Sequence, residues 1–273
     1  MQLSKKDAQK LGSHLKSCNL LQPSTHFAWY REQEREYLDF FTADCNICYC
    51  SNIDGLLNKL NLEIDPERWF LFMDSSESSF KAVLIHKQSL KFIPVAYTKA
   101  KKETRDLIGT VLEKINYSSH QWLVSADFKL IAVFMGLQGG YTQHPCYICL
   151  WRSREKNQYA EHYWAQRTEY EIGQNNVNAT PLVEREKVLV PPLHIRLGLF
   201  KNFIKSLDTD SVAFAHLRAI FPRLSNAKLQ AGVLNGPDIR KLTRNTSFAS
   251  FLSNEQQIAW KAILEVSEQV LGN

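Results

Sequence analysis

The sequence predicts a mixed α/β fold, in which a sheet with strands in both directions is flanked by helical segments. Two short apolar segments, residues 69–74 and 121–127, each end on an aspartate, and both suit a buried strand that ends on an acid. Residues 80–86 and 91–97 supply two more strand-like segments between them. Apolar residues within 101–116 recur at helical spacing, which predicts an amphipathic helix before the last strand.

The order of these segments defines the expected sheet. Short turn-rich stretches separate the first three strands, which predicts a three-stranded antiparallel meander. Pro94 falls in the third strand, and because proline cannot donate a ladder hydrogen bond, we expect this strand at an edge. Residues 128–137 read as a buried helix that Gly139-Gly140 stops.

We expect four regions along the chain. The first is helical and loop material that includes the amphipathic segments 1–15 and 29–38, and the last is helical, with boundaries at Pro222, Pro237 and Ser253. The predicted regions are residues 1–66 (helical), 67–140 (the core of strands and first helices), 141–190 (an insertion with a Cys-x-x-Cys) and 191–273 (helical).

Composition narrows the class of protein and of partner. The 273 residues are 44% hydrophobic and 22% charged, a globular balance that can bury a substantial core. No apolar run reaches about eighteen residues and the first ten are polar, so we expect a soluble intracellular protein without membrane contact. The net charge of +5 suits a polyanionic partner, because basic residues that neutralise phosphates release counterions. A solvated basic surface without such a partner is the alternative.

Asp74 and Asp127 are the candidate catalytic residues, since each closes one of the apolar strands. If those strands are neighbours, the two carboxylates would form a like-charge pair that is costly unless a cation lies between them. Mg²⁺ or Mn²⁺ is the expected ion, because hard divalent cations prefer carboxylate oxygen and can activate water for phosphodiester cleavage. The alternative is that each aspartate only caps the turn or helix that follows it.

Cys146 and Cys149 are candidate zinc ligands, because a Cys-x-x-Cys lets two thiolates bind one tetrahedral Zn²⁺. Zinc requires four ligands, and two buried thiols beside Trp151 are the alternative. The spacing selects none of the histidines that could complete the site, which are His144, His162 and His194. The cysteines at 45, 48 and 50 lack a partner pair, so we interpret them as buried or incidental.

Several short sequence motifs resemble those of a group of transposon-derived animal proteins. The resemblance extends from about Phe27 to the C-terminus. These motifs are Asp74-Ser75-Ser76, Ala126-Asp127-Phe128-Lys129, Met135-Gly136-Leu137-Gln138-Gly139-Gly140, Pro145-Cys146-Tyr147-Ile148-Cys149-Leu150-Trp151 and Pro191-Pro192-Leu193-His194-Ile195-Arg196-Leu197-Gly198. The element order also resembles the ribonuclease-H-like fold of DDE transposases. A wider likeness is to Transib transposases and the V(D)J recombinase, in which a Cys-x-x-Cys follows the second catalytic aspartate; here Cys146 follows Asp127 by 19 residues.

This resemblance implies metal-dependent DNA cleavage and strand transfer, with DNA as the partner and the nucleus as the location. Asp74 and Asp127 would be the first and second catalytic carboxylates. The family pattern continues with a His-x4-His that completes the zinc site and a glutamate that completes the metal triad, and neither motif occurs up to Asn273. Glu255, Glu265 and Glu268 stand in no matching motif, so we expect an incomplete site and no activity from this chain by itself.

Two other interpretations remain open at this stage. The first is a non-catalytic module, domesticated or decayed, that keeps the fold in order to bind DNA or a protein. The second is an unrelated α/β protein whose two aspartates are only caps.

Overall fold

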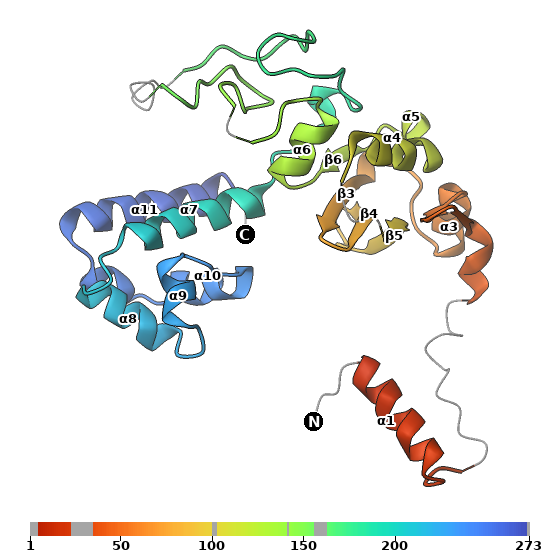
Figure 1. The fold of residues 1–273 in the computed structure, drawn as a ribbon, viewed down its shortest axis with the longest axis horizontal. Helices are drawn as coiled ribbons and strands as arrows, with labels where there is room; N and C mark the ends of the chain where they lie inside the picture. The colour runs from red at the N-terminus through yellow and green to blue at the C-terminus, as the bar shows by residue number, and fades with distance from the viewer. Residues whose placement is uncertain (1–4, 23–34, 100–102, 141, 156–162, 272–273) are drawn as a thin grey trace. The chain divides into compact units, whose positions relative to one another are not determined.

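The computed structural model describes residues 5–22, 35–99, 103–140, 142–155 and 163–271 (Figure 1). The chain forms two compact units, Met1–Leu123 and Val124–Asn273. Among the described residues, no helix is long and apolar enough to cross a membrane.

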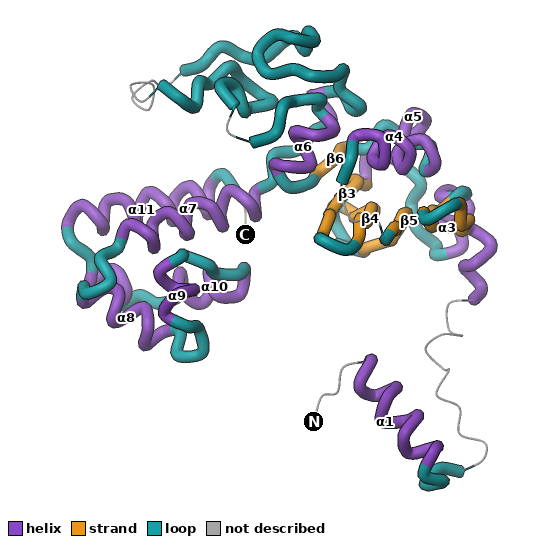
Figure 2. Tube along the Cα trace, in the orientation of Figure 1, coloured by secondary structure: helices purple, strands orange, loops and turns teal. Residues whose placement is uncertain are grey.

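The first unit carries most of the sheet and the helices next to it in the chain (Figure 2). Its helices are α1 (Lys5–Ser17), α3 (Ile53–Lys59), α4 (Arg105–Lys114) and α5 (Tyr117–His120), with 3-10 turns η1 (Arg35–Phe40) and η2 (Pro66–Arg68). Its strands are β1 (Phe41–Asp44), β2 (Ile47–Cys50), β3 (Trp69–Ser76), β4 (Ser79–His86) and β5 (Phe92–Thr98), and β6 (Leu123–Ser125) begins at its last residue.

The predicted meander of three antiparallel strands is confirmed. β3 pairs with β4 from Trp69↔His86 to Ser76↔Ser79, and β4 pairs with β5. Along β3, Trp69, Leu71 and Met73 are fully buried while the two phenylalanines between them are partly exposed, as period-two alternation requires. The predicted helix before the last strand is also confirmed as α4, whose N-cap Thr104 accepts a hydrogen bond from the Leu107 N–H at 3.2 Å.

The expectation of only helix and loop before residue 67 is wrong, because β1 and β2 form an antiparallel hairpin there. Their β-branched and aromatic residues suit strands, and Cys45 takes a positive φ of 54° in the two-residue connection. β2 then pairs with β5, which extends the sheet. The predicted helix over 29–38 lies mostly outside the described residues. Its last four residues form the start of the 3-10 turn η1.

Pro94 does not mark an edge strand, which corrects a second expectation. β5 lies between β4 and β2. The proline is tolerated there because the β4–β5 register shifts between Ala82 and Val83, and Val83 pairs with Pro94 just after that shift. A bulge breaks the regular ladder, so the missing N–H disturbs less of it.

The six strands form one sheet in the order β1-β2-β5-β4-β3-β6, so β6 neighbours β3. β6 is shorter than the predicted segment 121–127 and ends two residues before Asp127. On the second unit's side, Val124 makes a parallel bridge to Val188, and the Leu189 N–H donates to the Val124 carbonyl at 2.8 Å. A short extended segment therefore runs parallel to β6 after the long loop region.

The second unit is a helix and a long loop region followed by a helical bundle. It contains α6 (Phe128–Phe134), η4 (Arg185–Lys187), α7 (Pro192–Ser206), α8 (Val212–Ile220), α9 (Asn226–Gln230), α10 (Gly236–Thr243), η5 (Phe248–Phe251) and α11 (Asn254–Gln269). The expected boundaries are confirmed, since α8 ends before Pro222, Pro237 lies in the first turn of α10, and Ser253 caps α11. α7 and α11 lie side by side (Figure 1). Phe200, Phe214 and Leu217 are fully buried in the bundle core.

Gly136, rather than Gly139-Gly140, ends α6. Gly136 has φ 69°, its N–H donates to the Val133 carbonyl at 3.1 Å, and the Leu137 N–H donates to the Ala132 carbonyl at 2.8 Å. This pair of hydrogen bonds is the Schellman arrangement, which needs a left-handed residue that glycine adopts without steric cost.

Candidate functional site

Asp74 does not end its strand as expected, because β3 continues to Ser76 in register with β4. Its side chain is exposed, and the residue stands opposite Lys81 of β4. The next residue, Ser75, donates its hydroxyl to Glu103 Oε2 at 2.9 Å. Sequence reasoning did not single out Glu103. The meander offered a signal for this contact. Its up-down-up order brings the C-terminal ends of the first and third strands to the same end of the sheet, and Glu103 follows the third strand.

Asp127 is the N-cap of α6. Its Oδ1 accepts a hydrogen bond from the Leu130 N–H at 2.7 Å, with φ −70° and ψ 163°. The capping role considered from sequence is therefore real for this residue. A carboxylate has two oxygens with about four acceptor positions, so one cap hydrogen bond leaves acceptor capacity for another donor or a cation.

The two aspartates belong to different compact units. Among the residues that the structure describes, no group of three or more His, Cys, Asp or Glu side chains is arranged to hold a metal. Glu255, Glu265 and Glu268 are exposed along α11. The Oε1 atom of Glu265 lies 4.0 Å from Nζ of Lys261.

Cys146 and Cys149 lie together in the loop after α6, each partly exposed as a free thiol. The Ile148 N–H donates to Cys146 Sγ at 3.3 Å. Burial raises the pKa of Cys149, a backbone hydrogen bond from Trp151 opposes that change, and the Cys146 thiol is a hydrogen-bonding neighbour. Each of the two sulfurs therefore accepts an N–H from the residue two positions further on, and these hydrogen bonds fix where the sulfurs lie in the turn.

Long-range hydrogen bonds order this loop although it is irregular. Cys149 forms an antiparallel bridge with Gln166, the Leu150 N–H donates to the Ala165 carbonyl at 2.8 Å, and the Arg167 N–H donates to the Ile148 carbonyl at 2.8 Å. Arg167 is only 1% exposed. Sequence reasoning missed this residue, because its burial depends on contacts with a segment about twenty positions earlier.

The histidines considered as zinc ligands differ in position. His144 is buried in the cysteine loop, where its Nδ1 lies 3.2 Å from the Leu150 carbonyl oxygen. His194 lies in the first turn of α7, and His162 lies outside the described residues. Of the other cysteines, Cys45 and Cys48 are exposed, while burial raises the pKa of Cys50 to about 11.

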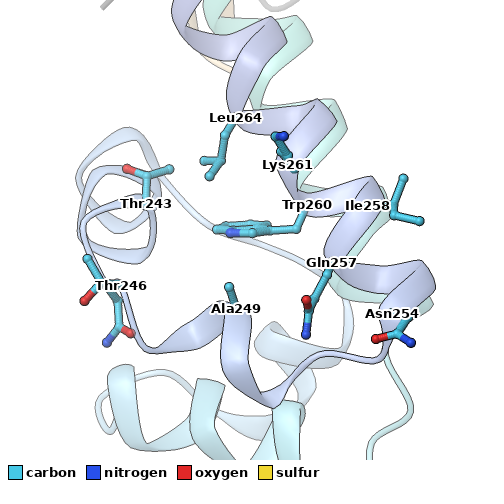
Figure 3. A pocket seen from close by; sticks show the side chains of 10 residues that line it. Thr243, Thr246, Ala249, Asn254, Gln257, Ile258, Trp260, Lys261 and Leu264 are labelled. Carbon is cyan, nitrogen blue, oxygen red and sulfur yellow. The ribbon is translucent and has the colours of Figure 1, made fainter.

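A separate pocket of about 730 Å³ opens in the helical bundle (Figure 3). Buried Trp260 forms part of its wall, and amide, hydroxyl and ammonium groups surround it. Its lining residues are Thr243, Asn245, Thr246, Ala249, Asn254, Gln257, Ile258, Trp260, Lys261 and Leu264. None of the predicted metal ligands is among them, so this pocket is independent of the predicted chemistry.

Comparison with protein families divides the chain near the start of α7. Residues 29–183 match the family described as a domain of unknown function (DUF8703). The chain belongs to the DUF8703 family. Residues 192–272 match a second domain of unknown function (DUF8704), which covers α7 to α11. No curated protein matches the chain. The DUF8703 match thus contains Asp74, Asp127 and both cysteines of the Cys-x-x-Cys.

Proposed function

We propose that this DUF8703 protein is transposase-derived and carries an incomplete DDE core with a ribonuclease-H-like fold. The observation that carries the proposal is the order of elements in chain and sheet. Three antiparallel strands, a helix, β6 beside β3, and a second helix follow one another, and a segment parallel to β6 comes after the loop region. Chemistry in α/β sheets gathers at and beyond strand ends, and Asp74 lies in the last residues of β3 while Asp127 follows β6.

Asp74 and Asp127 would hold Mg²⁺ or Mn²⁺, and the chemical types of their side chains suit such an ion. Both offer carboxylate oxygens, and the cap hydrogen bond of Asp127 occupies one of them. A bound divalent ion would polarise a phosphodiester and activate water. The chain's own contribution is to fix Asp127 through its cap. Without a third carboxylate, we expect this chain by itself to cleave no DNA.

Zn²⁺ is the proposed second cofactor, held in part by Cys146 and Cys149. N–H donors face both sulfurs and hold them in the turn. Two thiolates make half of a tetrahedral site, and His144 is the histidine of the same loop. The zinc would fix the loop rather than take part in cleavage.

DNA is the proposed partner, in keeping with the basic net charge and the transposase interpretation, and a nuclear location belongs to the same proposal. The second candidate function is a non-catalytic module that binds DNA or a protein. The cap role of Asp127 favours it, because that role explains the aspartate without a metal.

Mn²⁺-dependent DNA binding separates the two candidates. We expect added Mn²⁺ to tighten duplex DNA binding about tenfold, close to 1.4 kcal/mol, because a metal held by Asp74 and Asp127 can contact a phosphate. Asp74→Asn and Asp127→Asn should each remove this gain, and the amide side chain introduced by the second substitution would still cap α6. Fluorescence anisotropy at one fixed salt concentration measures the effect.

Asp106→Asn is the control, since Asp106 is an exposed carboxylate in the first turn of α4. Equal affinity with and without Mn²⁺ in every variant would support the non-catalytic module. Nicking of a supercoiled plasmid, scored in parallel, should be absent. Nicking by the wild-type chain that Asp127→Asn abolishes would show instead that the core is complete.

A further inference from the structure

Arg167 is a buried cation inside the cysteine loop. Its side chain donates from Nε to the Cys146 carbonyl at 2.9 Å and from Nη2 to the His144 carbonyl at 3.1 Å. The remaining nitrogen, Nη1, is buried without a hydrogen-bond partner among the described residues. Burial of a guanidinium with an unsatisfied donor is costly, so its retention needs a reason.

The surroundings of Arg167 identify what could compensate its charge. Within the described part of the chain, no carboxylate forms an ion pair with it. The ring of Tyr170 lies 5.7 Å from the guanidinium carbon. The groups that lie against the guanidinium are therefore the ring of Tyr170 and the backbone of the cysteine turn.

The two carbonyl hydrogen bonds also fix the cysteine turn. They hold the peptide oxygens of residues 144 and 146, on both sides of Pro145, from a segment 21 to 23 positions later. The Arg167 N–H donates to the Ile148 carbonyl in the same turn, at 2.8 Å. Arg167 thus contacts the backbone around Cys146 at three points, two through its guanidinium and one through its main-chain N–H. The forked guanidinium can reach both carbonyls at once, which a single ammonium could not.

We propose that Arg167 is the positioning residue of the Cys146–Cys149 metal site, which it holds in a binding geometry through the backbone of the turn. The inference rests on the proposed zinc role of these cysteines and deepens it. Loss of outer partners of metal ligands typically weakens metal binding about 10–100-fold, and we expect an effect of that size here.

Cobalt titration of the full chain tests the proposal, because Co²⁺ replaces Zn²⁺ and its thiolate charge-transfer absorbance reports cysteine ligation directly. We expect Arg167→Met to weaken Co²⁺ binding about 10–100-fold. Arg167→Lys keeps the charge and loses the fork, so its affinity should fall between that of Arg167→Met and that of wild type. Competition with a chromophoric chelator gives the matching Zn²⁺ affinities.

Arg185→Met is the matched control. Arg185 lies in the same loop region and donates to the Arg167 carbonyl at 3.0 Å and to Glu186, but not to the cysteine turn. Its replacement should leave Co²⁺ affinity within about twofold of wild type. Circular dichroism without metal compares folding, and if Arg167→Met fails to fold, Arg167→Lys decides.

The outcomes separate the inference from the zinc proposal. Thiolate absorbance that Cys149→Ser abolishes and Arg167→Met leaves at wild-type affinity would overturn the role of Arg167 while keeping the metal site. Absence of any thiolate–cobalt absorbance in wild type would overturn both. An equal loss in Arg185→Met and Arg167→Met would show a general loosening of the loop and would also overturn the specific role.

Discussion

Gly136→Ala is expected to destabilise the second unit by about 2–5 kcal/mol, combining backbone strain with overpacking. Gly136 has φ 69°, and a Cβ there would lie 1.9 Å from the Ala179 carbonyl oxygen. The loop cannot easily retreat, because the N–H groups of Asn178 and Ala179 both donate to the Gly136 carbonyl, at 2.7 and 3.1 Å. Urea unfolding followed by circular dichroism measures the change.

Gly139→Ala is the control for this prediction. Gly139 has no positive φ, and a Cβ there meets nothing within 4 Å. We expect its free energy of unfolding to stay within about 0.5 kcal/mol of wild type. Equal stability of both variants would mean that the chain does not turn at Gly136 as described.

Leu217→Ala is expected to cost about 2–5 kcal/mol, because it removes a fully buried side chain from the bundle core and leaves a cavity. Leu193→Ala is the matched control, since Leu193 is 54% exposed and also lies on a helix of the bundle. It should change the free energy of unfolding by about 0.5 kcal/mol or less. Similar losses in the two variants would contradict the packing of α8 against its neighbours.

The strands of the meander could be predicted because local information sufficed. Each has an apolar segment bounded by turn residues, and the second and third follow the first closely. The hairpin β1–β2 could not be predicted as easily, because its strands are four residues each and Cys50 is the one buried residue in them. Short strands with little hydrophobic alternation become strands by pairing with a neighbour, here β5, and that pairing is not visible in sequence.

The candidate site could be predicted only as far as residue types allow. The position of Asp127 before an apolar helix suited both a metal ligand and a cap, and the structure shows the cap. Cys146 and Cys149 were visible from their spacing. Arg167 could not be predicted as part of the site, because arginines mostly lie on the surface and only tertiary contacts bury this one. Glu103 could not be either, since its contact with Ser75 spans 28 positions.

Binding of Mn²⁺ itself tests the proposal that Asp74 and Asp127 share one divalent ion. Isothermal titration of the zinc-loaded chain should show one Mn²⁺ site that Asp74→Asn and Asp127→Asn each weaken by at least about tenfold, while Asp106→Asn leaves it unchanged. The same Mn²⁺ affinity in wild type, Asp74→Asn and Asp127→Asn would exclude a shared ion and leave both aspartates without a metal.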